Sequence, residues 1–392
     1  MRILYVCLDR GIPIGGTKGA SIHMEELLRA FEAEGHETAV LARHVARAWG
    51  RRTFLAPTTA SLRWVPGRVL RRDLREVAAG RVLRGAIREA VTALRPDLLY
   101  ERYSLFRTEA LSEAKRADLP HVLEVNAPLA WEERRFRGLA LGRAALRSER
   151  AAWIGTDLVV VPSEPMARRV RATGQEHVVV VPNAVDTSRF SAHRRRVDLR
   201  SRLDLEGRFV VAFAGSLKPW HDLRTLVLAA SALPARLRPA LLVVGEGPER
   251  ASLEREAGDL GLAARLVGGV SHNDVPEYLC AADVCVAGLS ADPDLDYFSP
   301  LKAVEYLACG RPTVVAAAGD LGHVAEDGAA LAYRPGDPRD LAARLVEIAD
   351  DPTLAARLGT AGRTLAEART WRHAARAVLQ AADRLPRTAS SV

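Results

Sequence analysis

Short apolar, β-branched segments alternate along the chain with longer segments in which apolar and polar positions follow a helical period. This pattern is typical of parallel β-sheets covered by helices on both faces, and it predicts the α/β class. The apolar segments fall into two sets. The first predicts strands at residues 2–8, 37–41, 97–100, 121–125, 157–161 and 177–181, with helices at 20–34 and 129–153. The second predicts strands at residues 209–214, 240–244, 264–267, 283–286 and 313–316.

The length of 392 residues exceeds what one hydrophobic core usually supports, so we expect two domains. We predict a first Rossmann-like domain at 1–185 and a second at 186–370, joined by a linker at 182–205. A C-terminal helix at 371–386 is expected to pack back on the first domain. Ligands commonly bind between domains, which predicts a site in an interdomain cleft.

The richest chemistry lies in residues 297–312, where a helix start, a cation and a carboxylate occupy three turns. Pro300 suits a first helical turn and Ser299 is a good N-cap, so we predict that the helix begins there. Lys302 adds a positive charge to the positive end of the helix dipole, and Glu305 lies one turn further on the same face. This spacing fits the phosphates and hydroxyls of a nucleotide sugar.

Two further loops combine glycine with a cation after a predicted strand. Gly15 and Gly16 precede Lys18 in the first strand-to-helix turn, and Ser216, Lys218 and His221 follow the strand that ends at residue 214. Neither loop has the G-x-G-x-x-G or G-x-x-x-x-G-K-[ST] pattern, which argues against a dehydrogenase or a P-loop. Ligands of open α/β sheets bind at the carboxyl ends of strands, where all these loops fall.

Charge is spread unevenly, because residues 1–185 carry +9, residues 186–370 carry −4 and residues 371–392 carry +3. The basic runs at 43–52 and 68–88 fit either an anionic lipid surface or acceptor, or ordinary solvated helix faces. They lack interleaved aromatic residues, so nucleic acid is not an expected partner.

The four cysteines lie in apolar stretches without metal-ligand spacing, which favours reduced core thiols. The sequence has neither an apolar run long enough for a membrane span nor a signal-peptide pattern. We therefore expect a cytoplasmic protein, with peripheral contact at the inner face of the membrane as an option through the basic first domain.

The order and spacing of several motifs along nearly the whole chain resemble the retaining glycosyltransferases of family 4, also called group 1 glycosyltransferases. The motifs are the glycine-rich first turn, V-P-N-A-V-D at 181–186, F-A-G-S-L at 213–217, G-E-G-P at 245–248, A-A-D-V at 281–284 and residues 305–312. The resemblance implies a GT-B fold of two Rossmann-like domains. The predominance of arginine over lysine suggests a GC-rich bacterial genome, which fits a transferase of cell-envelope glycans or natural products. A nucleoside-diphosphate sugar would be the donor, and a sugar, lipid-linked or small-molecule hydroxyl the acceptor.

The resemblance also implies roles for individual residues. Glu305 would hold the ribose, and the turn with Gly269 and Val270 would lie near the base. Ser299, Leu301 and Lys302 would meet the diphosphate. From the helix start and the two loops described above, we also expect the diphosphate near Pro300, Gly15, Gly16, Lys18, Ser216, Lys218 and His221.

Three positions depart from the family pattern. Tyr297 stands where a second glutamate is usual, so we expect the donor sugar near Asp296, Tyr297 and Phe298. Ser216 and His221 replace an arginine and a lysine. Asn126 replaces a first-domain histidine, and we assign it with Glu124 and Lys302 to catalysis: Asn126 orients a hydroxyl, and Glu124 either orients the acceptor or acts as base. An ion pair between Glu124 and a nearby arginine is the structural alternative.

With no clear enzymic nucleophile, the sequence suggests front-face transfer with electrostatic stabilisation of the departing diphosphate. No metal and no cofactor are expected, because the aspartates of residues 292–296 lack further spaced ligands. Two alternatives stay open: a nucleotide-sugar epimerase of the same fold, and a non-catalytic protein that binds a sugar nucleotide.

Overall fold

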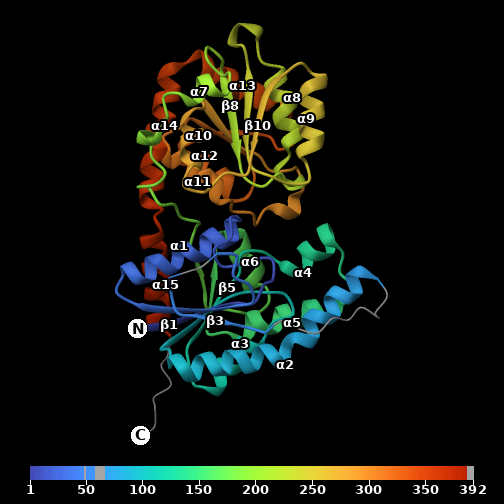
Figure 1. Ribbon diagram of the computed structural model, residues 1–392, viewed down its shortest axis with the longest axis vertical. Helices are drawn as coiled ribbons and strands as arrows, with labels where there is room; N and C mark the ends of the chain where they lie inside the picture. Colours follow the sequence, from blue (N-terminus) through green and yellow to red (C-terminus); the bar gives the residue numbers. More distant parts are fainter. Residues whose placement is uncertain (48–49, 58–66, 386–392) are drawn as a thin grey trace. The chain divides into compact units, whose positions relative to one another are not determined.

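The computed structural model describes residues 1–47, 50–57 and 67–385 (Figure 1). Contacts within the chain divide it into two compact units. Unit 1 comprises Met1–Pro182 and Trp371–Val392, and unit 2 comprises Asn183–Thr370. The C-terminal segment therefore belongs with the N-terminal residues, and the residues of the predicted linker from Asn183 onward belong to unit 2.

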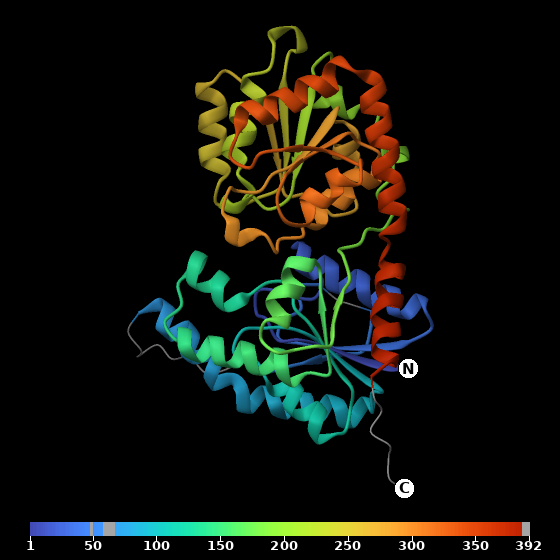
Figure 2. The same cartoon turned by 180° about the vertical axis from the view of Figure 1, so that it is seen from behind.

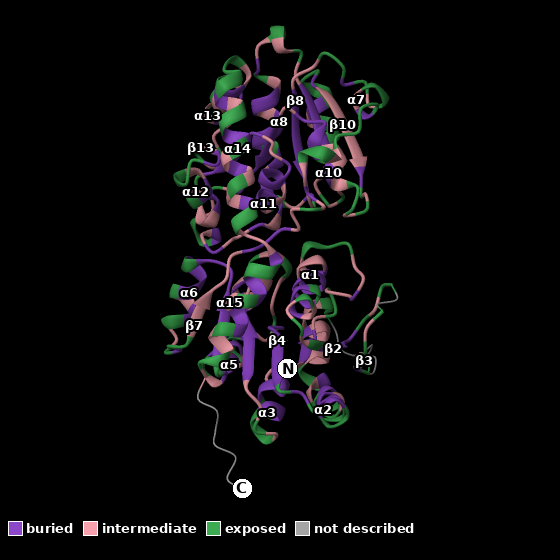
Figure 3. Cartoon of the chain, turned by 90° about the vertical axis from the view of Figure 1, so that its left-hand side faces the viewer, coloured by how far each residue is buried: buried purple, intermediate pink, exposed green. Residues whose placement is uncertain are grey.

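Unit 1 is built on a seven-stranded parallel sheet in the order β3-β2-β1-β4-β5-β6-β7. The five inner strands, β1, β2, β4, β5 and β6, are almost entirely buried (Figure 3), whereas the edge strands β3 and β7 are half-buried to exposed. The central strands bury residues on both faces, which is why their sequences read as continuous apolar runs. Their bounds are β1 (Arg2–Cys7), β2 (Glu37–Ala42), β3 (Thr53–Leu55), β4 (Leu98–Arg102), β5 (His121–Glu124), β6 (Leu158–Val161) and β7 (Val178–Val180).

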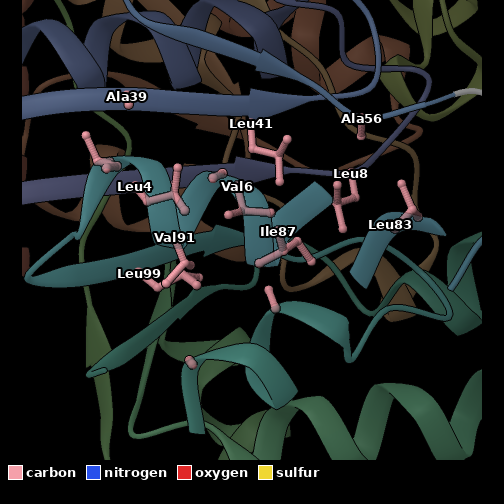
Figure 4. Packing of buried hydrophobic residues seen from close by; sticks show 14 of the residues in the cluster. Leu4, Val6, Leu8, Ala39, Leu41, Ala56, Leu83, Ile87, Val91 and Leu99 are labelled. Atoms are coloured by element: carbon pink, nitrogen blue, oxygen red, sulfur yellow. The ribbon is translucent and has the colours of Figure 1, made fainter. Parts of the chain in front are cut away.

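Successive residues of β1 point to opposite faces of this sheet. On one face Leu4 and Val6 pack with Ile87 and Val91 of the long helix α2, as Figure 4 shows. On the other, the ring of Tyr5 stacks on Tyr100. The helical segments of unit 1 are α1 (Gly19–Ala33), α2 (Arg68–Leu94), α3 (Glu109–Arg116), α4 (Leu129–Glu132), the π-helical turn η1 (Glu133–Arg137), α5 (Gly142–Gly155), α6 (Glu164–Arg171) and α15 (Trp371–Asp383).

The single helix predicted at 129–153 is wrong, because the structure breaks it into α4, η1 and α5. Gly138 has a φ of +80°, which ends the helical path. The backbone of the break is fixed by α2: Asp73 accepts the N–H groups of Ala140 and Leu141 at 2.7 and 3.1 Å. This tertiary anchor is invisible to the helical periodicity of the sequence.

Unit 2 contains a six-stranded parallel sheet in the order β10-β9-β8-β11-β12-β13, with helices on both faces (Figure 2). Its strands are β8 (Val210–Ala214), β9 (Ala240–Val244), β10 (Ala263–Gly268), β11 (Val284–Ala287), β12 (Thr313–Ala316) and β13 (Leu331–Tyr333). Its α-helices are α7 (Leu199–Arg202), α8 (Leu223–Ser231), α9 (Arg250–Asp259), α10 (Val275–Cys280), α11 (Leu301–Ala308), α12 (Gly319–Glu326), α13 (Pro338–Asp350) and α14 (Pro352–Ala368). Short 3-10 turns are η2 (Ala192–Arg194), η3 (Pro219–His221), η4 (Ala235–Leu237) and η5 (Pro293–Leu295).

The structure confirms the predicted α/β class, and it adds two strands. The strands β3 and β13, which the sequence patterns did not predict, are three residues long and lie at sheet edges. Short edge strands bury few residues, so they leave little apolar pattern to detect.

In each sheet the strand order reverses beside the first strand of the unit. In unit 1 the reversal lies between β1 and β4, and in unit 2 it lies between β8 and β11. The chain leaves two neighbouring strands in opposite directions at such a point, and this opens a crevice at their carboxyl ends. The crevice of unit 2 lies between the loops that follow β8 and β11.

Two glycines allow the loops after β8 and β9 to pack directly against each other. Gly245 has a φ of +140°, and a Cβ there would lie 1.9 Å from the carbonyl oxygen of Gly215. Gly215, with a φ of +150°, donates its N–H to Val244 at 2.9 Å. A side chain at position 245 would therefore push the loop after β8 away from its place.

We predict that Gly245→Ala destabilises unit 2 by about 2 kcal/mol or more, since strain at such a φ alone costs about 1–3 kcal/mol. Thermal and urea unfolding measure the loss. The control is Gly258→Ala in α9, where a Cβ would meet nothing within 4 Å. This change should leave stability equal or raise it by up to about 1 kcal/mol. Equal stabilities for the two variants would contradict the packing argument.

Candidate functional site

At the strand-order reversal of unit 2, residues 215–222 after β8 meet residues 288–300 after β11. The two loops are bonded together, because the N–H of Ser290 donates to the carbonyl of Trp220 at 2.9 Å. They also touch at Gly288, where a Cβ would lie 2.5 Å from the carbonyl oxygen of His221. Helix α11 follows the second loop and carries Lys302 and Glu305 to this place.

Lys302 places a buried ammonium group in the crevice region. The residue is 8% exposed, and Nζ lies 4.3 Å from the ring centre of Phe213. Gly215 leaves room for it, since a Cβ there would lie 3.1 Å from Nζ. Within the described part of the chain, Nζ has no hydrogen-bond partner. Burial lowers the pKa of Lys302 well below its ordinary value, and the charge of Glu305 opposes this only in part.

His221 lies beside this lysine without adding a second charge. Its ring contacts those of Phe213 and Phe298, with centroids 5.7 Å apart in each case. Burial, and after it the charge of Lys302, lower the pKa of His221 well below its ordinary value. The imidazole is therefore neutral near neutral pH and adds no charge beside Lys302.

The predicted N-cap at Ser299 is wrong. Helix α11 begins at Leu301 with Pro300 as the capping residue, and no side chain bonds the cap. The hydroxyl of Ser299 instead donates to Asp320 Oδ2 at 2.7 Å, and its carbonyl accepts from Asn183 Nδ2 at 2.5 Å. Because Ser299 is held from outside the helix, the first N–H groups of α11 lack a side-chain cap.

Glu305 is held by a residue that the sequence analysis did not identify. Its side chain is 13% exposed, and Oε1 lies 2.7 Å from Nε2 of His272. His272 follows β10 and is two residues beyond Val270. A cleft of about 360 Å³ lies beside Val270 and is lined by Arg196, Leu199, Arg202, Val270, Ser271, Asp274, Glu277 and Tyr278. Gly269 is exposed next to this cleft.

The other predicted donor residues of unit 2 divide into accessible and buried ones. Ser216 is exposed, and Lys218 is half-buried with Nζ 6.0 Å from the Trp220 ring centre. Half-buried positions are also found at Asp296, Phe298 and Leu301. Tyr297 is only 1% exposed, so the prediction that it contacts the donor sugar does not fit: its ring supports the loop from within the core.

The glycine turn of unit 1 is tied to its own unit. Gly15, with a φ of +74°, donates its N–H to Glu25 at 2.7 Å, and the N–H of Gly16 donates to Pro13 at 3.3 Å. Lys18 is exposed and donates to the carbonyl of Gly11 at 3.1 Å. The glycines thus serve a tight turn, and the N–H groups of both already have partners.

Glu124 ends β5 in a buried polar network at 3% exposure. The groups that bond its carboxylate are Arg102, Asn126, Tyr100 at 3.0 Å, His23 at 3.2 Å and Tyr5 at 3.3 Å. Burial opposes the charge, but His23 and Arg102 outweigh it and hold the pKa of Glu124 well below its usual range. A carboxylate that is so strongly stabilised as an anion is a poor base near neutral pH, so the base role does not fit.

The network of Glu124 lines a small cavity in unit 1 together with residues of α15. The cavity volume of about 20 Å³ holds no more than one water molecule. Asn126 is half-buried here, and Trp371 contacts His23 edge to face with centroids 5.0 Å apart. His23 is a second residue that the sequence analysis missed, because nothing local indicates that α1 and β5 meet.

Among residues 1–47, 50–57 and 67–385, no group of three or more His, Cys, Asp or Glu side chains is arranged to hold a metal ion. Within the same ranges, no helix is both long and apolar enough to cross a membrane. The four cysteines are unpaired and buried.

Comparison with known families identifies the chain. Residues 208–351 match the family described as glycosyl transferases group 1, and residues 17–189 match the one described as glycosyltransferase family 4. The chain belongs to the group 1 glycosyltransferases. Together the two matches cover these motifs, except for the part of the glycine-rich first turn that precedes residue 17, and they confirm the resemblance to group 1 glycosyltransferases.

Individual proteins similar to this glycosyltransferase share much of its length. A GDP-mannose-dependent alpha-(1-6)-phosphatidylinositol dimannoside mannosyltransferase of Mycobacterium tuberculosis is 28% identical, over 97% of this chain and 95% of the relative. A D-inositol 3-phosphate glycosyltransferase of Salinispora tropica is 36% identical over 38% and 34% of the two chains. The crystal structure of Anabaena HepE in complex with UDP superposes with a TM-score of 0.74, at 19% identity, and covers 98% of this chain and 100% of that one. The glycosyltransferase therefore has the GT-B fold.

We predict that Lys302→Met stabilises the ligand-free glycosyltransferase. A buried charged donor without a partner costs about 1–3 kcal/mol or more, and methionine fills similar space without that cost. Thermal unfolding without ligand should show a melting temperature several degrees higher, whereas Lys218→Met should stay within about 0.5 kcal/mol of the wild type.

The same substitution should change the pH dependence of stability. Because the folded pKa of Lys302 is lowered, the unfolded state binds more protons between that pKa and the pKa of a solvated lysine. The free energy of unfolding of the wild type then rises with pH through this interval, and Lys302→Met should lack that rise. A variant that is less stable at neutral pH would show that Lys302 already has a stabilising partner.

Proposed function

We propose that the protein is a retaining glycosyltransferase that moves a hexosyl group from a nucleoside-diphosphate sugar to an acceptor hydroxyl without a metal ion. One observation supports this most directly: Lys302 Nζ is buried, lacks a hydrogen-bond partner among the described residues, and lies where the loops after β8 and β11 meet. A buried cation at a crevice needs an anion, and a diphosphate supplies one.

The proposed donor extends from Lys302 along α11 and toward the end of β10. The diphosphate would contact Lys302 and the first N–H groups of α11, which lack a side-chain cap. The ribose would bond Glu305, and the base would lie near Gly269 and Val270. GDP-mannose is the first donor to test, because the relative that matches along most of this chain is named for it.

The proposed reaction proceeds by attack of the acceptor hydroxyl on the face from which the diphosphate leaves. Negative charge then develops on the departing phosphate oxygen. Lys302 would stabilise that charge from a low-dielectric position, with Lys218 and Ser216 at the accessible rim, and one such fixed donor is worth about 3–4 kcal/mol. Neutral His221 keeps the local field dominated by Lys302. Fixed cations in this place would stabilise the charge of the leaving phosphate, which a bound metal ion would otherwise stabilise.

The acceptor is proposed to bind unit 1 near Asn126. Glu124 would act there by holding the Asn126 amide and Arg102 in place rather than by taking a proton. Lys18 remains a candidate for a phosphate contact, since its side chain is exposed and is held only by a hydrogen bond to a loop carbonyl among the described residues. The acceptor hydroxyl would then lose its proton to the leaving phosphate, which needs no protein base.

We predict that Lys302→Met weakens binding of the preferred nucleoside diphosphate by about 100-fold or more, because a charge-assisted contact is lost. Calorimetric titration with GDP, GDP-mannose, UDP and UDP-glucose measures this, with a substitution of the exposed Lys115 of α3, Lys115→Met, as the control. Unchanged affinity of Lys302→Met for every donor would refute the proposal.

Turnover of the preferred donor tests the remaining parts of the proposed reaction. Product with the anomeric configuration of the donor, formed at full rate in EDTA, is expected; inversion or strict metal dependence would contradict it. An isomerised sugar nucleotide formed without acceptor would indicate the epimerase alternative. Binding without any turnover would indicate the non-catalytic one.

A membrane-facing surface on α5 is part of the same proposal, together with a cytoplasmic location. Along one side of this helix the exposed residues alternate between arginine and large apolar side chains: Arg143, Leu146, Arg147, Arg150 and Ile154. Leu146 is 56% and Ile154 43% exposed. Basic and apolar groups on one helical face fit the interface of an anionic bilayer, where a lipid-linked acceptor would be found.

We predict that charge reversal on this face, Arg143→Glu with Arg147→Glu and Arg150→Glu, weakens binding to phosphatidylglycerol vesicles by about 100-fold, at about 1 kcal/mol for each arginine removed. Vesicle sedimentation measures this affinity. The wild type and the variants should all bind phosphatidylcholine vesicles weakly. The matched control reverses three exposed arginines of unit 2: Arg334, Arg339 and Arg357. Equal effects of the two triple variants would show that net charge alone attracts the protein.

A further inference from the structure

Four side chains of unit 2 form a continuous polar chain that ends on Glu305. Asp186 Oδ2 lies 3.3 Å from Arg189 Nη2, Arg189 Nη1 lies 3.1 Å from His272 Nδ1, and His272 Nε2 lies 2.7 Å from Glu305 Oε1. Asp186 and Arg189 come from the first residues of unit 2, His272 follows β10, and Glu305 belongs to α11. The chain therefore connects three separate segments to the proposed ribose-binding carboxylate.

The two contacts of His272 determine which ring nitrogen carries the proton. A guanidinium group can only donate hydrogen bonds, so Nδ1 must accept from Arg189. A neutral imidazole then carries its proton on Nε2 and donates it to Glu305 Oε1. The hydrogen bond to Glu305 is thus directional, and it depends on Arg189 for its direction.

Arg189 is itself fixed at its other end. Asp186 Oδ1 accepts from the hydroxyl of Ser188 at 2.6 Å and from the N–H of Arg189 at 3.2 Å, which closes a tight turn. Burial opposes the charge of Asp186, but the hydrogen bonds of Ser188 and Arg189 lower the pKa of Asp186 below its ordinary value. The carboxylate that orients Arg189 is therefore ionised at neutral pH.

The ring of His272 is also held sterically and partly shielded from water. It packs on the ring of Phe190 with centroids 5.0 Å apart. The side chains of Arg189, His272 and Glu305 are 17%, 19% and 13% exposed. Partial burial strengthens each polar contact relative to an exposed one, so the orientation of Glu305 is well defined.

We propose that His272 is a positioning residue that sets the plane of the Glu305 carboxylate and thereby selects donors that carry a ribose rather than a 2′-deoxyribose. With Oε1 tied to His272, Oε2 is held in one direction to accept from the ribose hydroxyls. A carboxylate free to rotate would accept these bonds less well and would discriminate less between ribose and deoxyribose. This inference rests on the proposed function, in which Glu305 binds the ribose.

The test compares GDP with 2′-deoxy-GDP, or UDP with dUDP if uridine donors are preferred, by calorimetric titration of the full chain. We expect the wild type to prefer the ribonucleotide by about tenfold or more, the range for one hydrogen bond to a charged group. The His272→Ala variant should lose most of this preference for the ribonucleotide. Affinity for inorganic pyrophosphate, which has no ribose, should stay within about twofold of the wild type.

Two further variants separate positioning from a general effect on folding. His272→Gln offers an amide N–H in place of Nε2–H and should restore part of the ratio, whereas Glu305→Gln should abolish it. The double variant, His272→Ala with Glu305→Gln, should show the same ratio of ribonucleotide to deoxyribonucleotide affinity as Glu305→Gln alone, since the two residues act through one contact. The matched control is His323→Ala, which removes an exposed histidine that lies 2.9 Å from Glu326 in the same unit.

The possible failures are distinguishable. A ribonucleotide preference that survives in His272→Ala but not in Glu305→Gln would overturn the role of His272 and leave the proposed function standing. If His272→Ala loses affinity for pyrophosphate and for the nucleotide by the same factor, the positioning role of His272 is also overturned, because such a result shows that His272 only supports the structure. If the wild type binds neither nucleotide nor pyrophosphate, the proposed function itself fails.

Discussion

The buried ammonium group of Lys302 is the constraint on which the organisation of unit 2 depends. A cation with no hydrogen-bond partner among the described residues and a ring face at 4.3 Å is poorly stabilised, and its pKa is lowered as a result. Such a group is kept at a cost in stability, and an anion bound beside it, as proposed above, would offset that cost. The surrounding loops are arranged to hold that cation in place rather than to neutralise it.

That arrangement is made by backbone geometry at the reversal of strand order between β8 and β11. Gly215 approaches Lys302 closely because it has no side chain, and Gly245 allows the neighbouring loop to pack behind it. His221 fills the remaining space with a ring that stays neutral. Asn183 and Asp320 fix Ser299 from outside α11, which leaves the start of that helix open. Shape, rather than a second charge, therefore positions the lysine.

Unit 1 shows the opposite electrostatic solution. Glu124 is as buried as Lys302, but Arg102, His23, Asn126 and two tyrosine hydroxyls surround it, and it is held as an anion. A fully paired buried charge organises its neighbours and has little tendency to exchange protons. The two charged side chains therefore differ in their partners: Glu124, at the end of β5, is fully paired, whereas Lys302, in the first turn of α11, has no hydrogen-bond partner among the described residues.

The sequence by itself determined the α/β class, the central strands, the glycosyltransferase family and the segment that carries Lys302 and Glu305, because these depend on local periodicity and on motifs with fixed spacing. It did not determine the break in residues 129–153, the partners of Ser299 and Glu124, the burial of Tyr297, or the roles of His23 and His272. Only the tertiary structure decided these. A hydrogen bond between residues far apart in the chain, or the burial of one charge and the pairing of another, depends on which surfaces the folded backbone brings together.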